Sequence, residues 1–99
     1  METKIYVVKT NIRLTCEKMA LVLVQKELSL EYGGLTIIPN CSGLWVNDKN
    51  EFETDNVEIW EVVSNHLNLT FITKIALQLK RICTQKTQMF TVNGKPYYL

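Results

Sequence analysis

The sequence is poor in the residues that usually build catalytic and metal sites. It has a single histidine, His66, and three widely separated cysteines, Cys16, Cys41 and Cys83. An odd number of cysteines without a C-x-x-C pair argues against a disulfide framework and against a zinc site, and favours a reducing compartment. Neither a P-loop nor a G-x-G-x-x-G pattern is present. We therefore predict no metal, no cofactor and no catalytic constellation.

Long apolar runs and an excess of one charge are also missing. The longest apolar run, Met19 to Val24, is far too short to cross a bilayer. The N-terminus lacks the basic segment and apolar stretch of a signal peptide. With 11 basic and 10 acidic residues the net charge is +1, which gives no general attraction for nucleic acid. We expect a cytoplasmic protein without membrane contact, and composition does not support a nucleic-acid partner.

What the sequence does contain is enough apolar material for one core. Its 99 residues are 46% hydrophobic and 21% charged, which is ordinary for a globular domain. No linker, repeat or low-complexity segment interrupts the chain, so we predict a single domain over residues 1–99.

The hydrophobic period changes along the chain. Residues 5–8, 35–38, 44–46 and 57–63 are rich in β-branched and aromatic side chains and predict strands, with a stop at Pro39 and turns at 40–43 and 47–50. Apolar residues recur at helical spacing in residues 16–31, with Thr15 as N-cap and Gly33-Gly34 as terminator. A second stripe predicts a helix over residues 72–83. The two stripes consist of Cys16, Met19, Ala20, Leu23, Val24 and Leu28, and of Ile72, Ile75, Ala76, Leu79, Ile82 and Cys83.

The C-terminal segment predicts a β-hairpin. Asn93-Gly94 lies between residues 89–92 and 95–98, and Asn-Gly is a strong hairpin signal. Pro96 cannot donate a ladder hydrogen bond, so the last strand belongs at a sheet edge. The whole order predicts an α+β, ferredoxin-like βαββαβ fold with an extra C-terminal strand and two helices on one face of an antiparallel sheet. The open face favours a homo-oligomer.

Acidic residues offer one set of candidate sites. Six of the ten acids lie within fourteen positions, at Asp48, Glu51, Glu53, Asp55, Glu58 and Glu61. Such runs usually face solvent. Glu61 alternates onto an apolar strand face, where an acid needs a partner, and together with His66 it could serve as an acid–base pair.

Aromatic and basic residues offer the other set. Strand aromatics beside cations can stack bases and hold phosphates. The alternative is that the aromatics belong to the core and that the cations balance a helix C-terminus. For a small anionic ligand such as a nucleotide we select Trp45, Trp60, Tyr97 and Tyr98 for stacking, and Arg13, Arg81, Lys86 and Lys95 for phosphate.

One pattern resembles a known group of proteins. Gly33-Gly34-x-Thr36, then Gly43-x-Trp45, then Glu61-Val62, is similar to small uncharacterised phage and bacterial proteins with a G-G-x-T…G-x-W…E-V core. The resemblance covers residues 33–99 and implies a ferredoxin-like fold and a phage origin. It implies no activity or site.

These observations lead to three functional hypotheses. The first is a non-enzymatic, oligomeric binding protein, a phage anti-defence factor that sequesters a small anionic ligand or binds a host protein. The second is a small enzyme of the ferredoxin-like dimer type with Glu61 and His66 as acid and base. The third is a structural or interaction protein that uses an exposed sheet edge.

Overall fold

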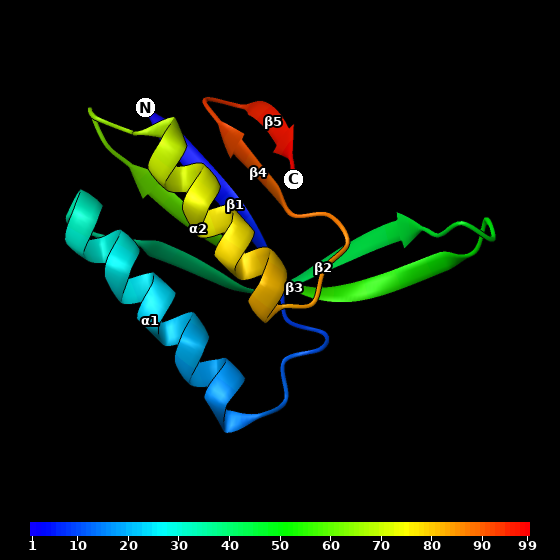
Figure 1. The fold of residues 1–99 in the computed structure, drawn as a ribbon. Coiled ribbons are helices and arrows are strands. Elements are labelled where there is room, and N and C mark those ends of the chain that lie inside the picture. The colour runs from blue at the N-terminus through cyan, green and yellow to red at the C-terminus, as the bar shows by residue number, and fades with distance from the viewer.

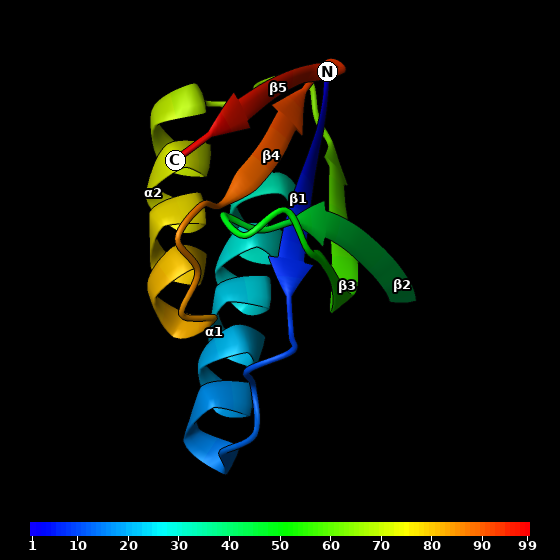
Figure 2. The ribbon, with the colours of Figure 1, turned by 90° about the vertical axis from the view of Figure 1, so that its right-hand side faces the viewer.

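Five antiparallel strands and two helices make up the computed structural model, which describes residues 1–99 (Figure 1). The strands pair in the order β2-β3-β1-β4-β5, and both helices cover one face (Figures 1 and 2). The predicted ferredoxin-like fold with an extra terminal strand is therefore confirmed, with Pro96 in an edge strand. Neither helix is long and apolar enough to cross a membrane. The elements are β1 (Glu2–Val8), α1 (Thr15–Tyr32), β2 (Thr36–Val46), β3 (Phe52–Val63), α2 (Leu69–Ile82), β4 (Met89–Val92) and β5 (Lys95–Tyr98).

The core lies between α2 and the middle of the sheet. The predicted α2 stripe is buried at Ile72, Ile75, Ala76 and Leu79, each fully shielded from solvent. Opposite it lie the helix-facing side chains of the three inner strands, Ile5, Val7, Trp60 and Phe90, also fully buried. Asn68 caps α2 by accepting a hydrogen bond from the Phe71 N–H at 3.1 Å.

Helix α1 is rotated relative to the prediction. Its buried side chains are Leu21, Val24 and Leu28, whereas Met19 and Leu23 are more than 60% exposed. Cys16 is also exposed. The helix is apolar on two sides, so its periodicity does not specify which side meets the sheet. The helix begins one residue earlier than predicted, with Leu14 rather than Thr15 at the N-cap position.

Strand β2 does not end at Pro39 as predicted. It continues to Val46 through a register shift between Ile38 and Cys41, where Asn40 takes a left-handed φ of 58°. A β-bulge accommodates the extra residue and bends the strand. Strand β3 also begins at Phe52, five residues before the predicted start at Val57.

The longer strands create a projecting two-stranded ribbon, residues 43–55, which we call the arm (Figure 1). Cross-strand pairing places Trp45 opposite Glu53, and Val46 opposite Phe52. Because cross-strand partners share a face, the arm has one side with Trp45 and Glu53, and another with Val46 and Phe52. The Asn47 side-chain oxygen orders the turn at the tip by accepting hydrogen bonds from the backbone N–H groups of Lys49 and Glu51.

Candidate functional site

A polar basin lies at the base of the arm, next to the ends of β1 and α2. It consists of two adjoining hollows of about 750 and about 640 Å³, which share Thr10, Thr54 and Asp55. Both lie within the size range of small-molecule sites. The larger hollow is lined by Thr10, Asn11, Trp45, Val46, Asn47, Asp48, Glu53, Thr54, Asp55, Thr84, Gln85, Lys86 and Thr87. The adjoining hollow adds Lys9, Ile12, Asn40, Cys41, Ser42 and Asn56.

The floor of the basin is fixed by hydrogen bonds between the end of β1 and β3. The Thr10 hydroxyl donates to Asp55 Oδ1 at 2.8 Å and accepts from the Asn56 N–H at 2.9 Å. The Lys9 N–H donates to the Asn56 carbonyl at 2.7 Å. These bonds hold the Asp55 carboxylate where the arm leaves the body, so its second oxygen is free for a ligand.

Trp45 supplies the aromatic wall of the basin. Its indole crosses the strand directly over Gly43, two residues earlier on the same face. A Cβ atom at Gly43 would lie only 2.8 Å from the indole Nε1. Because Gly43 has no side chain, the ring lies flat on the arm, and 41% of Trp45 remains exposed for a planar partner.

Lys86 enters the basin from the loop between α2 and β4. This loop is anchored by Gln88, which is almost fully buried. The Gln88 side-chain amide donates to the Tyr6 carbonyl at 2.7 Å, and its backbone exchanges two hydrogen bonds with Leu99 at 3.0 Å. Lys86 itself is exposed and has no ion-pair partner, so its ammonium is available to a ligand.

The charge of the basin is biased toward acid. The larger hollow contains three carboxylates, Asp48, Glu53 and Asp55, against the single ammonium of Lys86. Lys9, at the edge of the adjoining hollow, is neutralised by Glu58 at 3.3 Å. An acid-biased, open hollow favours a ligand with net positive charge. No group of three or more histidine, cysteine or acidic side chains is arranged to hold a metal ion.

The structure brings together two of the eight predicted ligand residues, Trp45 and Lys86. Arg81 instead lines a separate hollow between α1 and α2. Arg13 lies exposed in the loop before α1, outside the basin lining. The other predicted residues sit in the core or in the terminal hairpin.

Trp60 is corrected from a ligand residue to a core residue. It has no exposed surface, and its indole N–H donates to Glu58 Oε1 at 2.8 Å. The sequence left two sides open for its strand, and α2 covers the side on which Trp60 lies. Its ring is therefore closed to any ligand.

The terminal hairpin forms a cluster of its own. Tyr97 stacks on Phe90 with ring centroids 5.1 Å apart, and the Lys95 ammonium lies 5.6 Å from the Tyr97 ring centre. Tyr98 is 64% exposed at the sheet edge. Lys86 precedes β4, and Lys95 follows the turn after this strand. The two predicted phosphate ligands therefore lie at opposite ends of β4.

Glu61 and His66 are not part of the basin. Glu61 lies toward the opposite end of β3, 3.9 Å from the Lys4 ammonium, and His66 is exposed in the loop before α2. The structure therefore gives the predicted acid–base pair no shared site with the basin residues.

Several basin residues were not among the ligand residues predicted from the sequence, notably Thr10, Glu53 and Asp55. A signal for two of them was present, because a turn at 47–50 between β-prone runs pairs Trp45 with Glu53 and Gly43 with Asp55. Without this register, the acidic run is typical of a solvated segment. Nothing local in the sequence identifies Thr10, whose role depends on where β1 ends against β3.

Comparisons with known proteins give a structural match only. No protein-family model and no curated protein matches the chain. Two similar solved structures are a phage SAM lyase in complex with S-methyl-5'-thioadenosine and a phage SAM lyase in the apo state. The first has a TM-score of 0.65 at 13% identity, covering 99% of this chain and 87% of that one. The second has a TM-score of 0.57 at 12% identity, covering 99% and 86%. At this identity the likeness establishes a shared fold.

The match corrects the leading functional hypothesis. We expected a non-enzymatic protein that sequesters an anionic ligand or a host protein, yet the matching fold, over nearly the whole chain, is that of a lyase. The acid bias of the basin also opposes an anionic ligand. The enzyme hypothesis fits these findings better, although its acid–base residues lie elsewhere.

Proposed function

We propose that this chain is a small enzyme that binds and cleaves an adenosyl sulfonium of the S-adenosylmethionine type in the polar basin. The observation that carries the proposal is the basin itself, which combines one exposed indole, three carboxylates and one unpaired ammonium. It does so in a fold similar to that of a phage SAM lyase.

The chemical groups of such a ligand match the basin one by one. An adenine ring can stack on the open face of Trp45, as bases stack on aromatic side chains. The amino-acid carboxylate of the ligand can pair with Lys86. The sulfonium and the α-ammonium are cations, and Asp55 and Glu53 are the nearest carboxylates for them. With two positive groups and one negative, the ligand is a net cation, in keeping with the acid bias of the basin.

Cleavage of a sulfonium changes the charge that the basin must hold. When the bond between sulfur and the γ-carbon of the amino-acid chain breaks, its electron pair stays on sulfur, and the sulfonium becomes a neutral thioether. The substrate's own carboxylate supplies the new bond to that carbon by closing a lactone, so no further reactant is consumed. A carboxylate beside the sulfur therefore stabilises the bound substrate more than the transition state. We accordingly assign Asp55 and Glu53 to substrate binding. Orientation of the substrate's chain for the ring closure supplies the acceleration.

The test is turnover of S-adenosylmethionine labelled in its methyl group. Purified protein should release labelled S-methyl-5'-thioadenosine in many-fold excess over enzyme, measured by chromatography. Trp45→Ala should lower kcat/KM about 5- to 150-fold, since base stacking contributes roughly 1–3 kcal/mol. Lys86→Ala should act mainly by raising KM.

A matched control is Lys74→Ala, which removes an exposed α2 lysine whose only ion pair is with Glu27 at 3.7 Å. It should retain wild-type kinetics. Absence of turnover, together with no calorimetric binding of S-adenosylmethionine or of the thioether, would overturn the proposal. Stoichiometric binding without turnover would overturn its enzymatic part.

Three expectations from the sequence belong to the same proposal. A phage origin is supported by the phage source of both lyase structures. A cytoplasmic location is supported by three free cysteines, which persist as thiols in a reducing compartment. A homo-oligomer is supported by the large apolar side chains left exposed on α1 and on the arm.

A further inference from the structure

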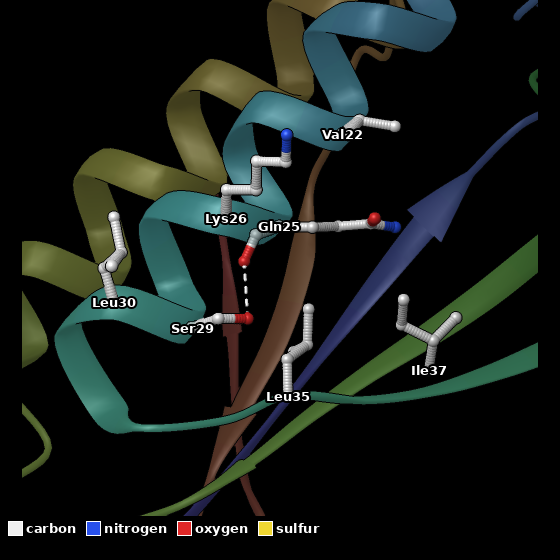
Figure 3. Close-up of a pocket in the computed structure, with 7 residues that line it drawn as sticks. All are labelled: Val22, Gln25, Lys26, Ser29, Leu30, Leu35 and Ile37. Carbon is white, nitrogen blue, oxygen red and sulfur yellow. Dashed lines mark hydrogen bonds between the residues drawn. The ribbon is translucent and has the colours of Figure 1, made fainter.

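An apolar groove runs between the outer side of α1 and the start of β2 (Figure 3). Its volume is about 470 Å³. Val22 and Leu30 of α1 line one wall, and Leu35 and Ile37 line the other, with their side chains directed toward the helix. Leu30 is 88% exposed, and the only charged residue of the groove is Lys26. A single exposed leucine is ordinary, but four adjoining apolar residues that line one groove are typical of an interaction surface.

The arm exposes a matching apolar side. Leu44, Val46 and Phe52 are 67%, 59% and 74% exposed. Phe52 and Trp60 are separated by an even number of positions in β3, so both lie on the helix-facing side of the sheet. Near Ile37 that side is covered by α1. Along the arm, which projects beyond both helices, no helix covers it (Figures 1 and 2), and of its three apolar residues only Val46 also lines the basin.

The arm cannot fill the groove of its own chain. It projects from the side of the molecule opposite α1 in Figure 1, so the arm and the groove lie apart within one chain. Two apolar surfaces that cannot meet within one chain can meet between two copies, either head to tail or in a reciprocal contact.

We propose that the arm of one copy seats in the α1–β2 groove of a second copy, with Phe52 as the anchor. A helix already covers this side of the β2–β3 ribbon near Ile37, and the second copy's α1 would continue that cover along the arm. The arm tip, where Asp48 and Glu51 outnumber Lys49, would lie beside Lys26 of the groove, which gives the contact charge complementarity.

Phe52 brings the largest single apolar area to the contact. Aromatic side chains bury roughly 150–250 Å² each, and Phe52 is 74% exposed in the single chain. Together with Leu44 and Val46, set against Val22, Leu30, Leu35 and Ile37 of the groove, it would form the apolar centre that specific interfaces have.

The first test is the mass of the protein in solution by native mass spectrometry and light scattering. The wild type should be oligomeric at about 10 μM, and Phe52→Ser should reduce it to monomer with unchanged circular dichroism. Tyr98→Ser is the matched control, since it removes an aromatic 64% exposed at the far edge of the sheet. Its mass should equal that of the wild type. A monomeric wild type, or an oligomeric Phe52→Ser, would overturn the proposal.

A mixing experiment identifies the two surfaces as partners. Leu30→Glu disables the groove and leaves the arm intact, whereas Phe52→Ser does the reverse. Each variant alone should be monomeric, and an equimolar mixture should form a heterodimer through the one intact pair of surfaces. A mixture that stays monomeric while both variants are folded would contradict arm-to-groove docking. This outcome is independent of turnover, so it separates the interface from the proposed enzymatic function.

Discussion

At the scale of single residues, the contact between Gly43 and Trp45 determines the shape of the basin. The indole occupies the space where any other residue would carry its Cβ, 2.8 Å from Nε1. Because Trp45 is 41% exposed, its ring can swing outward at little cost to the fold.

Gly43→Ala should therefore displace the Trp45 ring and weaken ligand binding while the melting temperature stays within a few degrees of the wild type. Tryptophan fluorescence and acrylamide quenching report the ring, because the other tryptophan, Trp60, is fully buried. Gly34→Ala is the control, since its Cβ would meet nothing within 4 Å. Unchanged quenching in Gly43→Ala would contradict this account of the glycine.

The cysteines differ in reactivity by position. Cys83 is fully buried against the core, and this burial raises its pKa from 9.0 to about 11. Reactivity toward disulfide reagents requires the thiolate. At pH 8, Ellman's reagent should label two thiols per folded chain, Cys16 and Cys41, and a third only after unfolding.

The same shift has a consequence for stability. A raised pKa in the folded state means that the stability contributed by Cys83 is present below about pH 9 and is lost as the pH rises toward about 11.

In the labelling experiment, rapid reaction of all three thiols in the native protein would show that Cys83 is not in the core.

At the scale of elements, Glu17 fixes the start of α1. Its carboxylate accepts hydrogen bonds from the Leu14 N–H at 2.8 Å and the Arg13 N–H at 3.1 Å. These bonds lower the pKa of Glu17 below its usual value of 4.5. The side chain of Leu14 cannot accept a hydrogen bond from the first turn, so α1 lacks the side-chain N-cap predicted at Thr15, and Glu17 instead orders the helix start by binding the two N–H groups before it.

Glu17→Gln should destabilise the protein at neutral pH and have a smaller effect at low pH. The depressed pKa means that the stabilisation is present above the unfolded pKa and is lost as the pH falls through the folded value. Urea unfolding at pH 7 and pH 3 measures this. Glu31→Gln, at the C-terminal end of α1, should lack the effect, and equal losses for both variants at pH 7 would contradict the cap.

At the scale of the whole molecule, the core and the arm are separate. No residue between Leu28 and Val57 is buried, so the arm contributes nothing to the hydrophobic core. It does supply Trp45, Glu53 and Asp55 to the basin and Phe52 to the proposed interface.

Replacing residues 45–53 by a short Asn-Gly turn should therefore leave a folded domain. We expect native circular dichroism and a melting temperature close to that of the wild type, with loss of ligand binding and of oligomers. Calorimetry and light scattering measure the two losses. A variant that fails to fold as a monomer would show that the arm, or the oligomer it forms, is needed for the fold.

The elements differ in how well the sequence predicted them. The α2 stripe at Ile72, Ile75 and Leu79 lies opposite a mostly polar side on which Leu77 is the one large apolar residue, so its burial followed from spacing. Helix α1 has a second apolar side that includes Met19 and Leu23, which spacing alone also assigned to the core. Pro39 suggested the end of a strand, and a bulge at Asn40 carried β2 past it.

The sequence by itself determined the order of the elements, the terminal hairpin and the ferredoxin-like class, because hydrophobic period and turn chemistry act between near neighbours in the chain. Only the tertiary structure decided that Trp45 and Lys86 share a basin, that Trp60 belongs to the core, and that one side of the arm stays bare. These features depend on strand register and on which face each helix covers. They are set by packing between segments distant in the chain, which local spacing does not encode.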